Sequence, residues 1–326
     1  MIINNTEFMI ITTLRVTETI FAFAIVVLLV VILKKKNIVS SGDLKSYSKL
    51  MMTAILPAVI FLQLSQNPVK GDQFILVFIM FMAGVSSMII TWIAGKIMRL
   101  RSETLGMLII TSTFGSSALI GYPLIQFAFP NNPVAMTDAI LISELGVGLP
   151  IFTLCPIVAA YYGSGSSGFK SIIKTLLNYL QSPIFISVIA GILFSQFQMI
   201  VKNPFMEPIW EALRMIQGTL TVLACLILGL QLKFRSARRL IPLFIVSAII
   251  QIGIQPFLAS FGADLLHVNL MDKQVLILIS AMPSAVLGTV FATQYQCDSE
   301  TASELVFLNI MVSLIGVPVV YYSMFH

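Results

Sequence analysis

The sequence predicts an all-helical membrane protein with ten transmembrane helices, arranged as two inverted repeats of five helices. Three observations lead to this prediction. The 326 residues are 58% hydrophobic and only 10% charged, whereas soluble domains carry about 25% charged residues. Ten apolar segments follow one another along the chain, and most are long enough to cross a bilayer. The two halves of the chain also resemble each other, and an odd number of spans per half inverts the second half in the membrane.

The apolar segments divide evenly around a polar linker. Residues 163–180 begin with the longest polar stretch, GSGSSGFKSIIK, and are expected to form a cytoplasmic Gly/Ser-rich linker. Residues 1–162 are then the first five-helix repeat and residues 181–326 the second. The ten predicted segments are 17–33, 50–65, 73–95, 104–129, 133–160, 182–199, 206–230, 239–261, 273–295 and 301–323.

The basic residues indicate how the chain is oriented. Most of the 19 lysine and arginine residues fall in the loops after segments one, three, five and seven. Cytoplasmic loops are enriched in these residues, so we expect a multi-pass protein of the plasma (cell) membrane with both termini outside. Because the basic residues lie in short loops between apolar segments, the net charge of +5 does not indicate that the protein binds nucleic acid. The lipid bilayer is the expected partner.

Two of the apolar segments are interrupted. Residues 111–123 of segment four read TSTFGSSALIGYP, and residues 280–288 of segment nine read SAMPSAVLG. Proline removes a helical hydrogen bond and glycine weakens a helix further. Main-chain groups freed in this way are tolerated in a membrane only where protein packs on them or where they line a cavity. Paired interruptions in corresponding positions of two halves indicate a transporter's binding site.

An alignment of the two halves supports the inverted repeat. Residues 117–121 match residues 284–288 at an offset of 167, and residues 148–150 match residues 316–318 at an offset of 168. A single inserted residue therefore keeps the register between the two motifs. Chance similarity between apolar segments is the alternative, but prolines and small residues recur here as well as leucine and isoleucine.

Five motifs follow one another in a fixed order along the chain. They are residues 56–58 after a basic loop, 114–124 in segment four, 144–146 with 152–153 in segment five, 281–287 in segment nine, and Ser313, Leu314 and Pro318 in segment ten. Together and in this order they resemble the motifs of the auxin efflux carrier family, which includes plant auxin exporters and bacterial organic-acid carriers. The resemblance covers nearly the whole chain.

This resemblance implies a fold similar to that of sodium/proton antiporters and bile-acid carriers, in which the broken helices four and nine cross at their breaks. It also implies a secondary membrane transporter of small organic anions, carboxylates such as malate, malonate or auxin-like acids, that works by alternating access. Carriers of this architecture are often dimers, so the resemblance suggests a homodimer, although no segment of the sequence indicates one.

The chain departs from the family pattern at positions where the family has asparagine. Ser116 replaces the asparagine of segment four, Leu287 that of segment nine, and Val147 and Gly148 the pair in segment five. An amide both donates and accepts hydrogen bonds, whereas serine has one hydrogen to donate and leucine has none. The substrate is therefore expected to be more apolar or to be held by main-chain groups, or a coupling-ion site is absent.

The candidate substrate-binding residues lie at the two interruptions. They are Ser116, Ser117, Gly121, Pro123, Pro283, Ser284 and Gly288. Half-helix N-termini at the breaks would direct partial positive charge inward and so favour an anion. Hydroxyl side chains near the first break would equally satisfy freed main-chain groups, so a purely structural role stays open.

Glu144 is the candidate residue for proton or ion coupling. It falls near the middle of segment five, where a charged carboxylate costs about 2.5–3.5 kcal/mol and where such residues mostly face a cavity. Burial favours the uncharged carboxyl, which suits proton exchange. The alternative is a protonated packing residue held by hydrogen bonds.

The sequence lacks the motifs of ATP-driven transporters, intramembrane enzymes and metal-binding proteins. It contains no Walker A motif, no HExxH and no Ser/Lys dyad in an apolar segment, which disfavours direct ATP use and an intramembrane enzyme. Cys155, Cys225 and Cys297 are far apart and have no metal-ligand spacing, so no metal or other cofactor is expected. A carrier-derived membrane sensor without transport remains an alternative because of the replaced asparagines.

Overall fold

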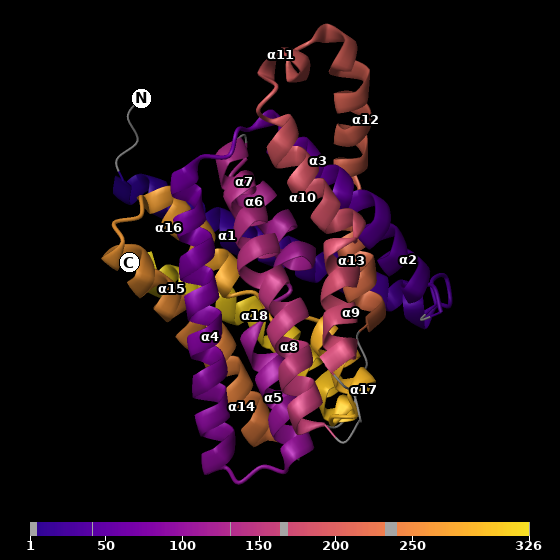
Figure 1. Ribbon diagram of the computed structural model, residues 1–326, viewed down its shortest axis with the longest axis vertical. Coiled ribbons are helices and arrows are strands. Elements are labelled where there is room, and N and C mark those ends of the chain that lie inside the picture. Colours follow the sequence, from indigo (N-terminus) through magenta and orange to yellow (C-terminus); the bar gives the residue numbers. More distant parts are fainter. Residues whose placement is uncertain (1–4, 41, 131, 164–168, 232–239, 326) are drawn as a thin grey trace.

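The computed structural model describes residues 5–40, 42–130, 132–163, 169–231 and 240–325. These residues form an all-helical bundle, and no β-strand occurs among them (Figure 1). Seven of the described helical stretches are long and apolar enough to cross a membrane, or eight if one bent pair counts as a span. The prediction of an all-helical membrane protein is therefore confirmed. The predicted basic loop at residues 232–239 and linker residues 164–168 lie outside the described residues.

The helices of the first half fall within the predicted segments or extend them by a turn or more. They are α1 (Asn5–Lys35), α2 (Leu44–Leu50), η1 (Met51–Ile55), α3 (Leu56–Gln66), η2 (Gly71–Gln73), α4 (Phe74–Ile97), α5 (Ser102–Thr113), η3 (Ser117–Gly121), α6 (Tyr122–Ala128), α7 (Pro133–Leu141), η4 (Ile142–Gly148) and α8 (Leu149–Tyr162).

The second half adds a helix ahead of the predicted segments. Its elements are α9 (Phe169–Leu180), α10 (Pro183–Phe194), α11 (Gln198–Val201), η5 (Pro204–Met206), α12 (Glu207–Gly218), α13 (Leu220–Gln231), α14 (Ile241–Ala248), η7 (Ile249–Ile254), α15 (Gln255–Leu265), α16 (Leu270–Ser280), α17 (Leu287–Gln294) and α18 (Ser299–Phe325). The helix α9 occupies residues that the sequence analysis includes in the linker, and it meets α10 at an angle of 49°.

Prolines shape four of the helical stretches. The elements η1, η3, η4 and η7 are wide, π-helical turns, and each ends two residues before a proline: Pro57, Pro123, Pro150 and Pro256. Proline has no N–H, and its ring clashes with the carbonyl four residues earlier. A widened turn moves that carbonyl away and keeps the helix continuous.

Predicted segments four and nine are each divided into two pieces. The helix α5 ends at Thr113 and η3 begins at Ser117, while α16 ends at Ser280 and α17 begins at Leu287. With 12 residues in α5 and 11 in α16, no piece has the roughly 20 residues that cross a bilayer. For this reason these two segments are not among the seven long spans.

Apolar and polar side chains are distributed as in a membrane protein. Phe21, Ile25 and Leu28 on α1 are each more than half exposed, whereas Gln251 and Asn309 are fully buried. An apolar exterior suits contact with lipid, and buried polar groups in membrane proteins usually form hydrogen bonds or face a cavity. The functional site is therefore expected inside the bundle.

The two ends of the bundle can be named by their residues. The helices α4, α7 and α16 begin at one end, where the side chains of Gln73, Asp138 and Asp272 interact; we call this the Asp138 end. The helix α4 ends and α5 begins at the opposite end, which we call the Arg101 end and which lies at the bottom of Figure 1.

Candidate functional site

The two interruptions lie against each other inside the bundle. The main chains of Gly115 and Ser284 pair as an isolated antiparallel bridge. The N–H of Ser116 donates to the carbonyl of Pro283 at 2.7 Å, and the N–H of Ala285 donates to the carbonyl of Phe114 at 2.9 Å. Each break thus supplies hydrogen-bond partners that the other lost when its helix stopped. Such pairing makes non-helical main chain tolerable away from water.

Gly115 permits this close approach. A Cβ atom at Gly115 would overlap the main-chain carbonyl oxygen of Met282. The predicted site residues Gly121 and Gly288 are also packed: a Cβ on Gly121 would lie 2.8 Å from Cδ1 of Ile279, and one on Gly288 would lie 3.3 Å from a methyl carbon of Thr111. Small residues therefore allow the two halves to contact each other at the crossing.

The paired prolines of the two motifs have different surroundings. Pro283 lies in the second break, and its carbonyl accepts the Ser116 N–H. Pro123 instead lies inside the continuous helical stretch Ser117–Ala128, where the wide turn η3 before it accommodates its ring. Both are buried.

A carboxyl group lies beside the first break. Glu144 is 5% exposed; its Oε1 accepts a hydrogen bond from the Tyr122 hydroxyl at 2.6 Å, and its Oε2 lies 3.3 Å from the Tyr179 hydroxyl. The Tyr179 hydroxyl also lies 3.0 Å from the main-chain carbonyl of Glu144. The hydroxyls of Ser117 and Ser143 are 2.7 Å apart. We call these five residues the acidic cluster.

Tyr179 brings α9 to this cluster. Its ring stacks on Phe152 with 4.3 Å between ring centroids, and Gly148 makes room for its hydroxyl, which a Cβ there would approach to 2.5 Å. Tyr179 was not among the residues predicted from the sequence. The residue lies in a stretch expected to be a linker, and no local pattern in the sequence connects it to Glu144.

A second polar cluster, without a carboxyl, lies beside the second break. The Ser284 hydroxyl is 2.6 Å from the carbonyl of Thr111, 2.7 Å from Gln251 Oε1 and 2.6 Å from Asn309 Nδ2. Asn309 Nδ2 also donates to the hydroxyl of Ser247 at 2.7 Å. We call Ser247, Gln251, Ser284 and Asn309 the amide cluster.

One orientation of the Gln251 amide satisfies more of the hydrogen bonds in the amide cluster than the other. A serine hydroxyl has one hydrogen, so Ser284 cannot donate to both Thr111 and Gln251. With the oxygen and nitrogen of the Gln251 amide exchanged, its NH2 group donates to Ser284, which then donates to Thr111. The carbonyl oxygens of Gln251 and Asn309 are then the acceptors left without a donor, and both side chains are fully buried.

Gln251 and Asn309 were missed by the sequence analysis, although a signal was present. Both are amides inside predicted apolar segments, and polar residues in spans usually mark an internal site. Ser284, their partner, was among the predicted site residues.

A hollow of about 440 Å³ lies where α6 ends and α7 begins. It is formed by residues of α3, α6, α7 and α12 and the segment before α7: Gln63, Ile125, Gln126, Phe129, Asn132, Pro133, Met136 and Gln217. None of these side chains is charged, and four are amides. Gln126 lies one helical turn after Tyr122, so α6 connects the hollow to the acidic cluster.

This arrangement defines a class of protein. A bundle with an apolar exterior, two interruptions hydrogen bonded to each other, and polar clusters on both sides of that crossing is the architecture of a membrane transporter.

The chain belongs to the membrane transport protein family, whose sequence model matches residues 15–163 and 166–321. This is the auxin efflux carrier family that the motifs resemble, and the chain is a membrane transporter of that family. It is 25% identical to an uncharacterized transporter of Methanocaldococcus jannaschii over 285 residues, covering 86% of this chain and 89% of the relative. A second relative, an uncharacterized transporter of Methanothermobacter thermautotrophicus, is 24% identical over 307 residues, covering 93% and 96%.

Proposed function

We propose that this transporter is a secondary carrier that moves a small organic anion across the plasma membrane by alternating access at the crossed breaks. The main observation in favour is the pairing of Ser116 with Pro283 and of Phe114 with Ala285. This pairing places non-helical main chain between two buried polar clusters. Polar main chain at such a place is expected where a passenger molecule binds.

We further propose ten spans in two inverted repeats, residues 1–162 and 181–326, with the second repeat extended at its start by α9, which forms one span with α10. Seven long stretches and the bent pair α9–α10 account for eight spans. The broken helices, α5 with α6 and α16 with α17, would be the fourth and ninth. In this arrangement the Arg101 end faces the cytoplasm, both termini lie outside, and the Asp138 end is external.

A carboxylate suits the chemistry near the crossing. The continuous stretch Ser117–Ala128 and the helix α17 both begin directly after a break, and helix N-termini carry partial positive charge that attracts anions. The amides of the hollow offer N–H donors without charge. These features support malate, malonate or an auxin-like acid as the substrate class.

Glu144 would couple the passenger to protons. A carboxylate beside the path of an anion repels it, and protonation removes that repulsion. Binding of a proton at Glu144 would therefore favour binding of the anion. A passive uniporter, in which Glu144 stays in one protonation state, is the alternative.

The test is uptake into proteoliposomes of labelled malate, malonate and indole-acetate, with and without a pH gradient. Saturable uptake of at least one acid is expected, with a larger rate under the gradient. Protein-free liposomes provide the background. A sensor derived from a carrier would show a carboxylate-dependent shift in thermal unfolding but no uptake, and an intramembrane enzyme would convert the acid to a new product. Either of these results would contradict the proposal.

A further inference from the structure

Asp138 is a fully buried carboxyl in the second turn of α7. Its Oδ1 accepts a hydrogen bond from Nε2 of Gln73. The Oε1 of the same Gln73 amide accepts from the main-chain N–H of Lys70 at 2.8 Å. The amide orientation is therefore fixed, and it offers its NH2 group to Asp138.

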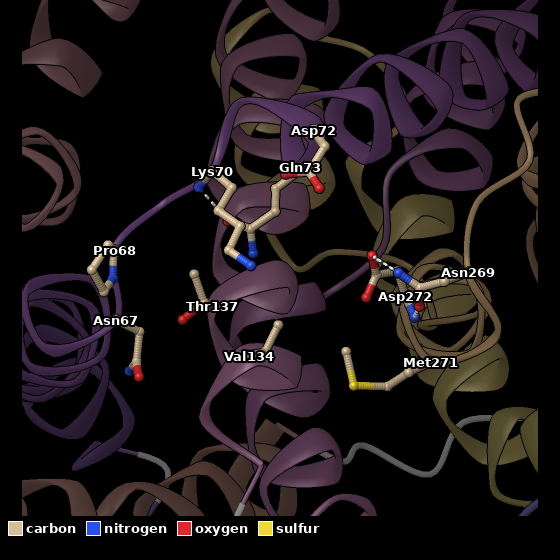
Figure 2. Close-up of a pocket in the computed structure, with 10 residues that line it drawn as sticks. All are labelled: Asn67, Pro68, Lys70, Asp72, Gln73, Val134, Thr137, Asn269, Met271 and Asp272. Atoms are coloured by element: carbon tan, nitrogen blue, oxygen red, sulfur yellow. Dashed lines mark hydrogen bonds between the residues drawn. The ribbon is translucent and has the colours of Figure 1, made fainter.

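The other oxygen of Asp138, Oδ2, has no hydrogen-bond donor among the described residues, and a second carboxyl lies beside the Asp138 side chain. This second carboxyl is that of Asp272, which interacts with the Asp138 side chain. Asp272 lies in the first turn of α16, where its Oδ2 accepts from Nδ2 of Asn269 at 2.6 Å. Figure 2 shows Asp272 and Asn269 together across a pocket from Lys70 and Gln73.

The charged neighbours of this pair come from three elements. Asp72 in η2 adds negative charge near both carboxyls, and Lys70, just before η2, adds positive charge near Asp272. Lys273, the neighbour of Asp272 on α16, forms an ion pair with Asp264 on α15, with 2.6 Å between Nζ and Oδ1. None of these charged groups donates a hydrogen bond to the buried Oδ2 of Asp138.

Asp138 is fully buried, whereas Asp272 is half-buried and lines the pocket. A carboxylate disfavours ionisation of a second, buried carboxyl beside it. A protonated carboxyl has an O–H to donate, and a hydrogen bond from it to the second carboxylate would satisfy both oxygens. We propose that Asp138 and Asp272 share one proton and form a proton-binding site between α7 and α16 at the Asp138 end. This site is separate from Glu144 and does not depend on the transport proposal.

The position of the site gives the proton a structural effect. The helix α7 continues into η4, which contains Glu144, and α16 leads to the second break. A second contact, between Nδ2 of Asn132 and the sulfur of Met271 at 2.8 Å, also joins the two regions. Loss of the shared proton places two negative charges between α7 and α16 and pushes them apart.

The test is the thermal unfolding midpoint of the purified protein, measured from acidic to alkaline pH without substrate. The folded pair retains a proton that the unfolded carboxyls release, so the stability of the wild type falls as pH rises. The Asp138→Asn and Asp272→Asn variants each keep a neutral hydrogen-bonding group, and both are expected to lose the same part of this pH dependence. The control Asp264→Asn, at an exposed carboxyl nearby, is expected to keep it.

Two results would overturn the proposal. One is a pH dependence in Asp138→Asn and Asp272→Asn equal to that of the wild type. The other is a rise in the wild-type midpoint with Mg²⁺ or Ca²⁺ at neutral pH that Asp138→Asn lacks, because the pair would then hold a divalent cation instead of a proton. If Asp138→Asn fails to fold, infrared spectroscopy is used instead, on the Glu144→Gln variant, which lacks the buried carboxyl of Glu144. This variant is expected to show a protonated carboxyl at neutral pH. A spectrum without a protonated carboxyl would also refute the shared proton.

Discussion

The two breaks carry equivalent serines but have different polar surroundings. Ser117 and Ser284 occupy matching positions at the offset of 167 residues. Ser117 contacts one hydroxyl, that of Ser143, and its neighbourhood contains the carboxyl of Glu144. Ser284 instead contacts three polar groups, and none of them is charged.

This difference suits the first half to proton coupling and the second half to holding its break rigidly against neighbouring helices. At the offset of 168 residues that relates Gly148 to Gly316, Glu144 corresponds to Val312, which is 38% exposed. Only the first half therefore has a titratable group at this position. The second break is held through Ser284 to η7, α18 and α5, so its hydrogen bonds fix three helical elements relative to one another.

Separation of the two breaks is expected to have the largest effect. A Gly115→Val substitution places a side chain against the Met282 carbonyl and forces the main chains apart. Loss of stability at or above the about 1–3 kcal/mol typical of overpacking, together with loss of uptake, is expected from thermal unfolding and proteoliposome assays. Gly218→Ala is the control, because a Cβ there meets nothing within 4 Å. A stable, active Gly115→Val protein would show that the breaks need not touch.

The next effect concerns the acidic cluster alone. The Glu144→Gln substitution keeps hydrogen-bonding atoms near Tyr122 and Tyr179 but removes the titratable group. Uptake is expected to lose its stimulation by a pH gradient, while the amount of folded protein in the membrane stays close to that of the wild type. Glu211→Gln, at an exposed residue paired with Arg214, is the control. Unchanged stimulation in Glu144→Gln would remove the proposed functional difference between the two clusters.

In the amide cluster, the Ser284→Ala substitution tests whether the hydrogen bonds of Ser284 hold the second break against its neighbouring helices. The substitution leaves the Thr111 carbonyl without the Ser284 donor and removes a partner from the amides of Gln251 and Asn309. A buried polar group left unpaired costs about 1–3 kcal/mol, so a clear fall in the thermal midpoint is expected. Ser284→Thr keeps the hydroxyl and is the matched variant. A midpoint equal to that of the wild type in Ser284→Ala would mean that the three contacts do not hold the break.

The sequence predicted what depends on local chemistry. Small residues and prolines near Ser116 and Pro283 indicated two interruptions, and both are present. Pro283 lies in the second break, whereas Pro123 lies in the helical stretch Ser117–Ala128 that follows the first. Glu144 was found for a similar reason, because a carboxyl in the middle of a predicted apolar segment is visible in the sequence alone and indicates an internal site. These inferences needed no knowledge of packing.

The remaining features depend on contacts between distant residues. Tyr179 reaches Glu144 only because α9 packs on α8, and Asp138 meets Asp272 only because α7 and α16 begin at the same end. Nothing near either residue in the sequence specifies its partner. The amides of Gln251 and Asn309 are an intermediate case: their polarity was visible, but their common partner Ser284 was not.

The smallest expected effect completes the comparison of the two serines. Ser117→Ala removes one hydroxyl–hydroxyl contact, and Ser143 can turn its own hydroxyl to a main-chain carbonyl of the preceding helical turn. The loss is therefore expected to be about 0.5–1.5 kcal/mol, the net value of an ordinary hydrogen bond, and smaller than the loss in Ser284→Ala. Thermal unfolding of both variants in the same detergent measures the difference. Equal losses would mean that matching positions in the two halves have equal structural weight, and the asymmetry would then be limited to the charge of Glu144.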